Sequence, residues 1–359
     1  APGTTEFNVG AGKIKVDAKA RCVSVVAGSQ CAALEFNAWG SSNPANTRLV
    51  TTNTDADSID ISAISGTAAH KGFSNIHGST MVTAGGLEIL TSKITDDSKF
   101  AFNVTGDILI TSPNASFEAP LNIDGDWTFT NAPASLTIGN SGTSGANQNT
   151  AELNSSIGFT AANSIKLYGG NINLSAGNIT TTASGAPILI KGTGYILSGA
   201  GASLTAQKLF QTLNGSITLW ADAENNLSGR INIGNYNKFN SQGGRITIAG
   251  GLDDGGTAAE INASVLVAND GFPDGYARAE ASGNSVSTPG LNLGIKTELL
   301  SANGDIVVAG RGSQSSSTVS QESGMWAYAI NVNSGTGKIG MFAKSTSVNL
   351  AYSYAMYLI

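Results

Sequence analysis

The sequence predicts an all-β protein, a right-handed parallel β-helix (a β-solenoid) with a less regular N-terminal capping region and loop insertions toward the C-terminus. Gly accounts for 45 of its 359 residues. Short strands of alternating apolar and polar residues, each introduced by a Gly or Asn turn, recur along the whole chain. One such strand buries only two or three side chains, too few to offset the conformational entropy lost on ordering, so it must stack on similar neighbours.

The repeated phrase is a Gly followed by a strand of the type x-Ile-x-Val. Its instances are residues 12–16, 106–110, 125–129, 215–219, 244–248, 304–308 and 337–341. Gly106 follows Gly86 by 20 residues, and Gly125 follows Gly106 by 19. These intervals suit one solenoid turn, and the longer intervals later in the chain are expected to carry loops.

An antiparallel sandwich is the competing fold. It would need tight Asn-Gly or Asp-Gly hairpins between paired strands. The pairs at residues 124–125, 214–215 and 303–304 have this composition. Each of them precedes a strand at the spacing of a solenoid turn, which favours the solenoid.

Two regions are expected within the chain. Residues 1–84 are interpreted as an N-terminal cap or irregular β region, because a solenoid needs a cap over its open first coil. Residues 85–359 are interpreted as the solenoid repeats, with long loops after residue 250.

Charge and composition exclude some partners and favour export. The chain has 19 Lys and Arg against 25 Asp and Glu, a net charge of −6, and only 12% charged residues. Without a basic cluster it lacks the positive charge that phosphate contacts require, so no nucleic-acid partner is expected.

The sequence starts at Ala1 with no initiator Met or signal segment, which favours a mature exported chain or an excised fragment.

The two cysteines are Cys22 and Cys31, nine residues apart. An even count at this spacing in an exported chain predicts a disulfide that closes a small loop, and two buried free thiols are the alternative.

Several runs resemble a known family. They are residues 243–251 (GGRITIAGG), 273–277 (PDGYA), 291–294 (LNLG) and 303–312 (NGDIVVAGRG). These runs are similar to the β-helical repeats of filamentous-haemagglutinin-like exoproteins, which include the high-molecular-weight adhesins. The resemblance covers residues 85–345 and implies an adhesin of the bacterial surface, exported by two-partner secretion with an outer-membrane partner. The family's secretion domain carries Asn-Pro-Asn-Leu motifs, whereas residues 43–46 here read NPAN.

A carbohydrate-active β-helix enzyme, such as a polysaccharide depolymerase or a tailspike-like protein, is the alternative function. Glycoside hydrolysis needs two carboxylates about 5 to 9.5 Å apart. Asp107 and Asp126 are the candidates if they occupy equivalent places in neighbouring turns, although solvated turn corners explain both. We expect no catalytic residues and no cofactor.

The acidic loops after residue 250 have a second interpretation as a calcium site, because Ca²⁺ takes six to eight oxygen ligands. The candidate ligands are Asp253, Asp254, Asp270 and Asp274. Asp beside Gly is also an ordinary turn signal. His70 and His77 are interpreted as surface or cap residues rather than metal ligands.

The expected function is therefore adhesion or biofilm formation by a secreted protein of the cell surface or extracellular matrix, which binds host or matrix glycans or proteins. The last nine residues are β-prone and uncharged, so they predict an open sheet edge through which copies join head to tail into a filament. The predicted interface residues are Tyr352, Tyr354, Met356, Tyr357, Leu358 and Ile359.

Overall fold

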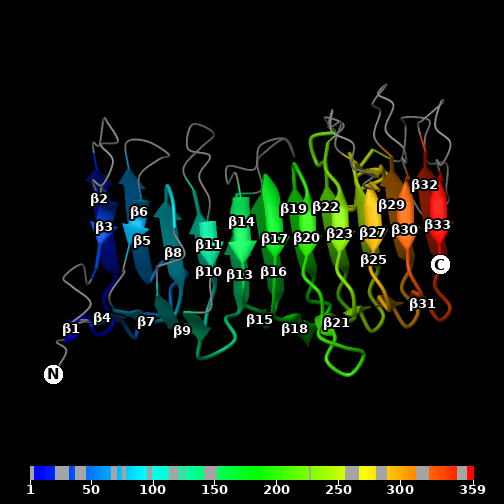
Figure 1. Cartoon of the computed structure of the whole chain (residues 1–359). Coiled ribbons are helices and arrows are strands. Elements are labelled where there is room, and N and C mark those ends of the chain that lie inside the picture. Colours follow the sequence, from blue (N-terminus) through cyan, green and yellow to red (C-terminus); the bar gives the residue numbers. More distant parts are fainter. Residues whose placement is uncertain are drawn as a thin grey trace.

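The computed structural model describes residues 4–20, 32–36, 46–65, 71–74, 78–94, 99–112, 121–123, 126–140, 152–225, 228–254, 267–279, 289–312, 323–345 and 354–359. Within these residues all the regular elements are β-strands, and every pair of named strands is parallel. The strands stack side by side along one axis, from the N-terminal end to the C-terminal end (Figure 1). The prediction of stacked parallel strands is confirmed, and the antiparallel sandwich is excluded.

The longest sheet, sheet B, supplies one strand to each of eleven successive turns in the described part of the chain. These strands are β2 (Ile14–Ala20), β5 (Ile59–Ser65), β8 (Leu87–Thr91), β10 (Ile108–Thr111), β13 (Ser135–Ile138), β16 (Ser164–Gly169), β19 (Ile188–Gly192), β22 (Ile217–Ala221), β25 (Ile246–Gly250), β29 (Ile306–Arg311) and β32 (Ile339–Lys344). A short strand, β26 (Ala277–Arg278), pairs with the end of β29.

A second wall, sheet C, follows sheet B in each turn. Its strands are β3 (Ala32–Glu35), β6 (Lys71–Ser74), β11 (Leu121–Ile123), β14 (Glu152–Ser155), β17 (Asn171–Leu174), β20 (Ile196–Ser198), β23 (Ile231–Ile233), β27 (Leu291–Leu293), β30 (Met325–Ala327) and β33 (Met356–Leu358). Bridges from Phe73 to Ile94 and from Ile94 to Leu121 join β6 to β11.

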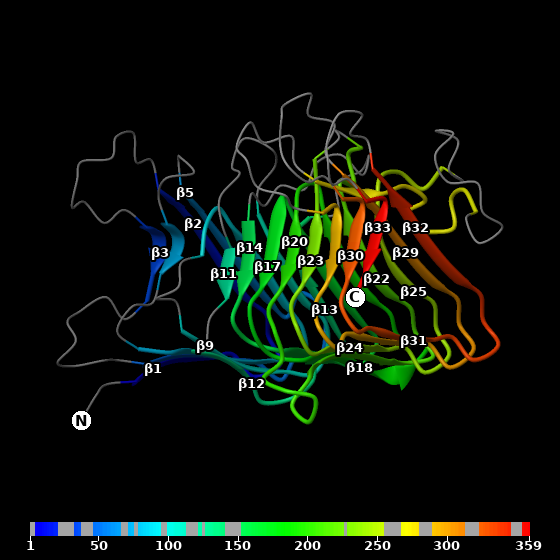
Figure 2. The ribbon, with the colours of Figure 1, turned by 45° about the vertical axis from the view of Figure 1, so that its right-hand side comes forward.

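The third wall precedes sheet B in each turn and consists of two sheets. Sheet A contains β1 (Thr4–Asn8), β4 (Asn46–Val50), β7 (Thr80–Ala84), β9 (Phe100–Val104) and β12 (Trp127–Phe129). Sheet D contains β15 (Phe159–Ala161), β18 (Ile179–Ser184), β21 (Lys208–Leu213), β24 (Asn237–Asn240), β28 (Glu298–Leu300) and β31 (Asn331–Asn333). Figure 2 shows the three walls enclosing one interior.

Side chains of one kind form ladders inside the rod, because the parallel register places equivalent residues of successive turns next to each other. In sheet B, Ile188 pairs with Ile217 and Ile217 with Ile246, all fully buried. In sheet D, the rings of Phe210 and Phe239 stack with centroids 4.5 Å apart. The buried apolar residues form one continuous core from Ile14 to Ala327.

The corner that leads into sheet B explains the recurring Gly. A Cβ on Gly244 would fall on the carbonyl of Gly215, and a Cβ on Gly304 would fall on the carbonyl of Gly244. The hydroxyls of Ser241 and Ser301 donate to the carbonyl oxygens of Gly244 and Gly304. The backbone of each corner therefore lies directly on the backbone of the preceding corner. The carbonyl oxygen of each of these two glycines accepts a hydrogen bond from a buried serine hydroxyl.

One large insertion separates β25 from β27, and part of its described segment, residues 267–279, packs on sheet B. Its residue Tyr276 packs against Ala249 and Ala309 on the outer side of the sheet. Within the same insertion, Arg278 Nε lies 3.4 Å from the fully buried Asp222 Oδ2. The expected long loops after residue 250 are thus partly folded onto the wall of the rod.

One detail differs from the expectations. The phrase at residues 125–129 does not enter sheet B: β12 pairs with β9 in sheet A, and the next sheet B strand begins at Ser135. The division of the chain at residue 84 stays an expectation; β7, which ends at that residue, pairs in register with β9.

Candidate functional site

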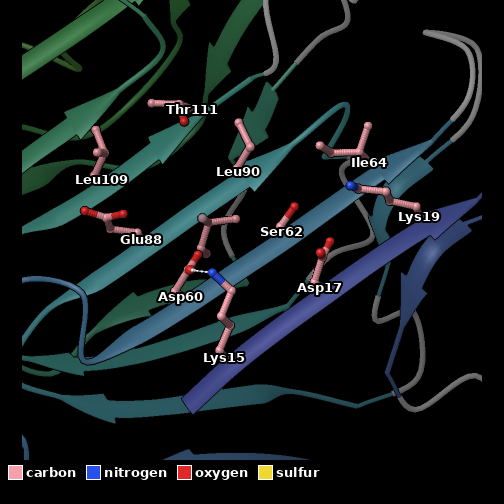
Figure 3. A pocket seen from close by; sticks show the side chains of 11 residues that line it. Lys15, Asp17, Lys19, Asp60, Ser62, Ile64, Glu88, Leu90, Leu109 and Thr111 are labelled. Carbon is pink, nitrogen blue, oxygen red and sulfur yellow. Dashed lines mark hydrogen bonds and ion pairs between the residues drawn. The ribbon is translucent and has the colours of Figure 1, made fainter. Parts of the chain in front are cut away.

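A hollow of about 420 Å³ lies on the outer face of sheet B near the N-terminal end (Figure 3). It is lined by residues of β2, β5, β8 and β10, and its polar side chains form rows across the strands. Lys15, Asp60 and Glu88 occupy directly neighbouring positions. Lys15 Nζ lies 2.9 Å from Asp60 Oδ2, and this hydrogen bond raises the pKa of Lys15.

The hollow brings the carboxylates of Asp60 and Glu88 to neighbouring positions. The predicted pair, Asp107 and Asp126, is not brought together in this way. Asp107 immediately precedes β10 of sheet B, whereas Asp126 precedes β12 of sheet A and forms an ion pair with Lys99 at 2.9 Å. The expectation that Asp107 and Asp126 occupy equivalent places is therefore wrong. The intervals between glycines could not separate the two walls, because strands of both walls begin with the same phrase.

The acidic loops do meet, but through backbone groups. The carboxylate of Asp253 accepts hydrogen bonds from the N–H groups of Asp270 (3.1 Å) and Gly271 (2.8 Å). Asp270 Oδ2 lies 2.9 Å from Arg245 Nη1, whose guanidinium stacks 4.3 Å from the ring of Phe272.

The other two predicted calcium ligands have different surroundings. Asp274 is 1% exposed, and its N–H donates to Leu252, while Asp254 is half-buried. Among the described residues, no group of three or more His, Cys, Asp or Glu side chains is placed to hold a metal ion. Calcium binding at these loops remains a prediction that the observed contacts do not favour.

The outer face of sheet C carries a row of asparagines, which we call the asparagine face. Its members are Asn122, Asn154, Asn173, Asn232 and Asn292. Asn154 Nδ2 donates to Asn122 Oδ1 at 2.8 Å, and Asn292 Nδ2 donates to Asn232 Oδ1 at 2.7 Å. A hollow of about 290 Å³ lies along the first three members. Uncharged amides suit such a row because, unlike charges, they can stack and bond to each other.

Aromatic side chains continue this row toward the C-terminal end. Trp326 pairs with Asn292, and Tyr357 pairs with Trp326. The rings of Trp326 and Tyr328 are 6.4 Å apart, and those of Tyr354 and Tyr357 are 5.1 Å apart. Among the described tryptophans, Trp127 is buried in the core and Trp220 is buried with its Nε1–H on Gly251, so Trp326 alone offers ring surface to solvent.

A hollow of about 180 Å³ adjoins Trp326, and we call it the Trp326 hollow. It is lined by Arg230, Asn232, Pro289, Asn292 and Trp326. Arg230 Nε and Asn292 Oδ1 are buried and have no hydrogen-bond partner among the residues that the structure describes. The hollow thus combines an aromatic ring with the polar side chains of one arginine and two asparagines.

Sequence reasoning missed this arrangement because it depends on the register of three turns. The four tryptophans are dispersed in the sequence, and the intervals from Asn232 to Asn292 and from Asn292 to Trp326 are unequal. One local signal was present in the sequence. Trp326 and Tyr328 are separated by a single residue, and in an extended segment residues two apart point to the same side.

The predicted assembly residues lie at the C-terminal end of the stack, except Tyr352, which falls outside the described residues. Leu358 and Ile359 are 61% and 62% exposed, and Tyr354 and Tyr357 are also exposed. Met356 is half-buried against the core. Cys22, Cys31, His70 and His77 also lie outside the described residues, so the disulfide and the roles of both histidines stay predictions.

Comparison with models of known protein families, with curated proteins and with solved structures finds no match to this chain. Within the described residues, no helix is long and apolar enough to cross a membrane.

Proposed function

We propose that this chain is a secreted bacterial protein of the cell surface or extracellular matrix that acts in adhesion or biofilm formation. In this proposal it is a right-handed β-helical rod that binds glycans or proteins of the host or matrix and assembles head to tail. Its continuous core and rows of uncharged polar side chains support a structural role. Its repeat phrases support the resemblance to exported adhesins.

The observation that carries the proposal is the Trp326 hollow. Sugar rings offer an apolar face that stacks on an indole, and hydroxyls that bond to polar side chains such as those of Arg230, Asn232 and Asn292, which line the hollow. The hollow is smaller than the about 300–1,000 Å³ of sites that enclose a whole small ligand. It therefore suits one residue of a neutral polysaccharide, with affinity built up by several copies of the rod.

Binding to immobilised neutral polysaccharides, such as mannan, chitin and β-glucan, tests this function. We expect Trp326→Ala to weaken binding at least tenfold, a loss of about 1.4 kcal/mol. Leu197→Ala is the matched control, because Leu197 lies in the same row between Asn173 and Asn232 but outside the hollow. Equal binding by Trp326→Ala and the unchanged chain would contradict the proposal.

The rival function is a carbohydrate-active enzyme, and the neighbouring Asp60 and Glu88 are the observation that favours it. Glycosidases use two such carboxylates. Asp60, however, already forms an ion pair with Lys15. We expect no release of reducing ends from the same polysaccharides, and release that disappears in Glu88→Gln would establish the enzyme instead.

A further inference from the structure

The first and last described turns of the rod have closely similar sequences. Residues 8–19 read NVGAGKIKVDAK, and residues 333–344 read NSGTGKIGMFAK. Seven of these twelve positions are identical: the Asn, both glycines, the Lys-Ile pair, and the final Ala-Lys pair. In both turns this segment runs from the end of a strand of the third wall through the corner and along the strand of sheet B.

The two corners also have the same backbone structure. Gly10 and Gly335 have φ angles of 60° and 62°. The N–H of each donates to the preceding Asn side chain, Gly10 to Asn8 at 3.2 Å and Gly335 to Asn333 at 2.9 Å. A second bond is also shared, from the N–H of Gly12 to Val9 (3.1 Å) and from that of Gly337 to Ser334 (3.0 Å).

Neighbouring turns of this rod place like residues on like residues. Ile339 pairs with Ile306 and Met341 with Val308, while the corner of Gly337 rests on that of Gly304. Among the described residues, β32 pairs on one side only, with β29, and β2 pairs on one side only, with β5. Ile339 is 48% exposed, and at the other end Phe7 is 51% exposed.

We propose that the first turn of a second copy stacks on the last turn of this chain, with β2 of that copy parallel to β32. This inference rests on the proposed head-to-tail assembly and adds its partner surface and its register. Ile14 then pairs with Ile339, Val16 with Met341 and Ala18 with Ala343, so the ladders of sheet B continue from copy to copy.

The same register also brings apolar residues of the third wall into contact between the two copies. Phe7 precedes Ile14 by seven residues, and Val332 precedes Ile339 by seven, so Phe7 covers the half-buried Val332. Lys13 comes to lie beside Lys338, and the charge of Lys13 is already matched by Asp55 and Asp57. Lys19 comes to lie beside Lys344, a like-charge pair that costs part of the apolar gain.

Gly12 supplies a variant that separates assembly from folding. Within one chain, a Cβ on Gly12 meets only Val9, with its nearest atom, the carbonyl oxygen, at 3.2 Å, and Gly12 does not have a positive φ. In the stack, that Cβ would fall on the carbonyl of Gly337, as a Cβ on Gly337 falls on the carbonyl of Gly304. We expect Gly12→Ala to reduce filament yield at least tenfold, while the melting temperature of the isolated chain falls by no more than about 2 °C.

A cross-linking experiment tests the register. In it, a chain with Asp17→Cys is mixed with a chain with Phe342→Cys, since these outward-facing positions become neighbours in the stack. After oxidation, peptide mass spectrometry should find the 17–342 disulfide. The control is Gly340→Cys in place of Phe342→Cys, two residues out of register, for which we expect at most one tenth of the yield.

The outcomes distinguish the two proposals. Filaments that persist in Gly12→Ala, or that cross-link equally well out of register, would overturn the register but leave head-to-tail assembly standing. Absence of any assembly by the unchanged chain, under conditions that include concentrated protein and raised salt, would overturn both. Binding of polysaccharide through Trp326 is measured separately and depends on neither result.

Discussion

Lys208 is a charged side chain in the interior of the rod. It lies at the first position of β21, on the same side as the buried Phe210, and is 4% exposed. Its Nζ donates to the backbone carbonyl of Leu174 at 2.5 Å, and burial lowers the pKa of this amine to about 8. The folded chain must therefore either hold a poorly solvated ammonium or release a proton.

The pH dependence of stability follows from this pKa. In the unfolded chain the lysine titrates near pH 10.4, so between about pH 8 and pH 10 the unfolded state binds more protons than the folded state. The free energy of unfolding should therefore rise with pH across this window, by on the order of 2–3 kcal/mol in total. Urea unfolding at pH 7 and pH 9.5 measures the rise.

Lys208→Met should remove this part of the pH dependence, because methionine fills similar space without a proton to lose. Lys166→Met is the control, since Lys166 is exposed on the outer face of sheet B. An equal rise in stability in the unchanged chain and in Lys208→Met would show that Lys208 does not titrate as proposed.

The corner glycines give a second prediction for single residues. Gly304→Ala places a Cβ on the carbonyl of Gly244, and relief requires neighbouring backbone to move apart. We expect a loss of on the order of 2–4 kcal/mol in the free energy of unfolding, measured by denaturant titration. Gly12→Ala, at the equivalent corner of the first turn, should lose less than about 1 kcal/mol. Equal losses at both positions would contradict the stacking of corner on corner.

At the scale of elements, the strands of sheet B were predictable and those of the other walls less so. Residues 215–219 and 244–248 each show a Gly, a polar residue and alternating aliphatic residues. The strands β22 and β25 begin at the aliphatic residues of these two phrases. Residues 125–129 show the same phrase but form β12 in sheet A. Local periodicity reports that a strand buries one face, and it does not report which wall of a triangular stack the strand enters.

The candidate site was harder to predict for the same reason. Asn232, Asn292 and Trp326 form one row only because β23, β27 and β30 are neighbours, and an insertion separates the first two in sequence. A reader of the sequence sees isolated Asn and Trp residues at unequal intervals. The exposure of Leu358 and Ile359 was easier to predict, since an uncharged β-prone segment needs no distant partner to be recognised, while their role in assembly stays a prediction.

β33 gives a prediction at this scale. It completes the last turn by pairing with β30, and its residue Leu358 covers Ala327. Leu358→Asp should place a charge on the end of the core ladder, where a second copy would bury it, and so reduce assembly at least tenfold. Electron microscopy measures the effect, with the exposed Leu204→Asp on the loop after β20 as the control. Equal loss of assembly in the control would show that added charge, and not its position, is responsible.

At the scale of the whole molecule, the described residues form one core wrapped by eleven turns, and the first and last of these turns have matching sequences. Successive strands in a sheet are spaced by about 4.8 Å. If a second copy continues the stack in the proposed register, the interface adds the same spacing as any other turn. The filament then has one chain per eleven strand spacings, an axial repeat of about 53 Å.

Helical reconstruction of assembled protein by cryo-electron microscopy measures this repeat and tests the account most directly. We predict a smooth filament of continuous cross-strand spacing, with one chain every 53 Å or so along its axis and Ile14 of one copy beside Ile339 of the next. Single rods that never join end to end, compact trimers, or filaments in which the rods pack side by side would contradict it.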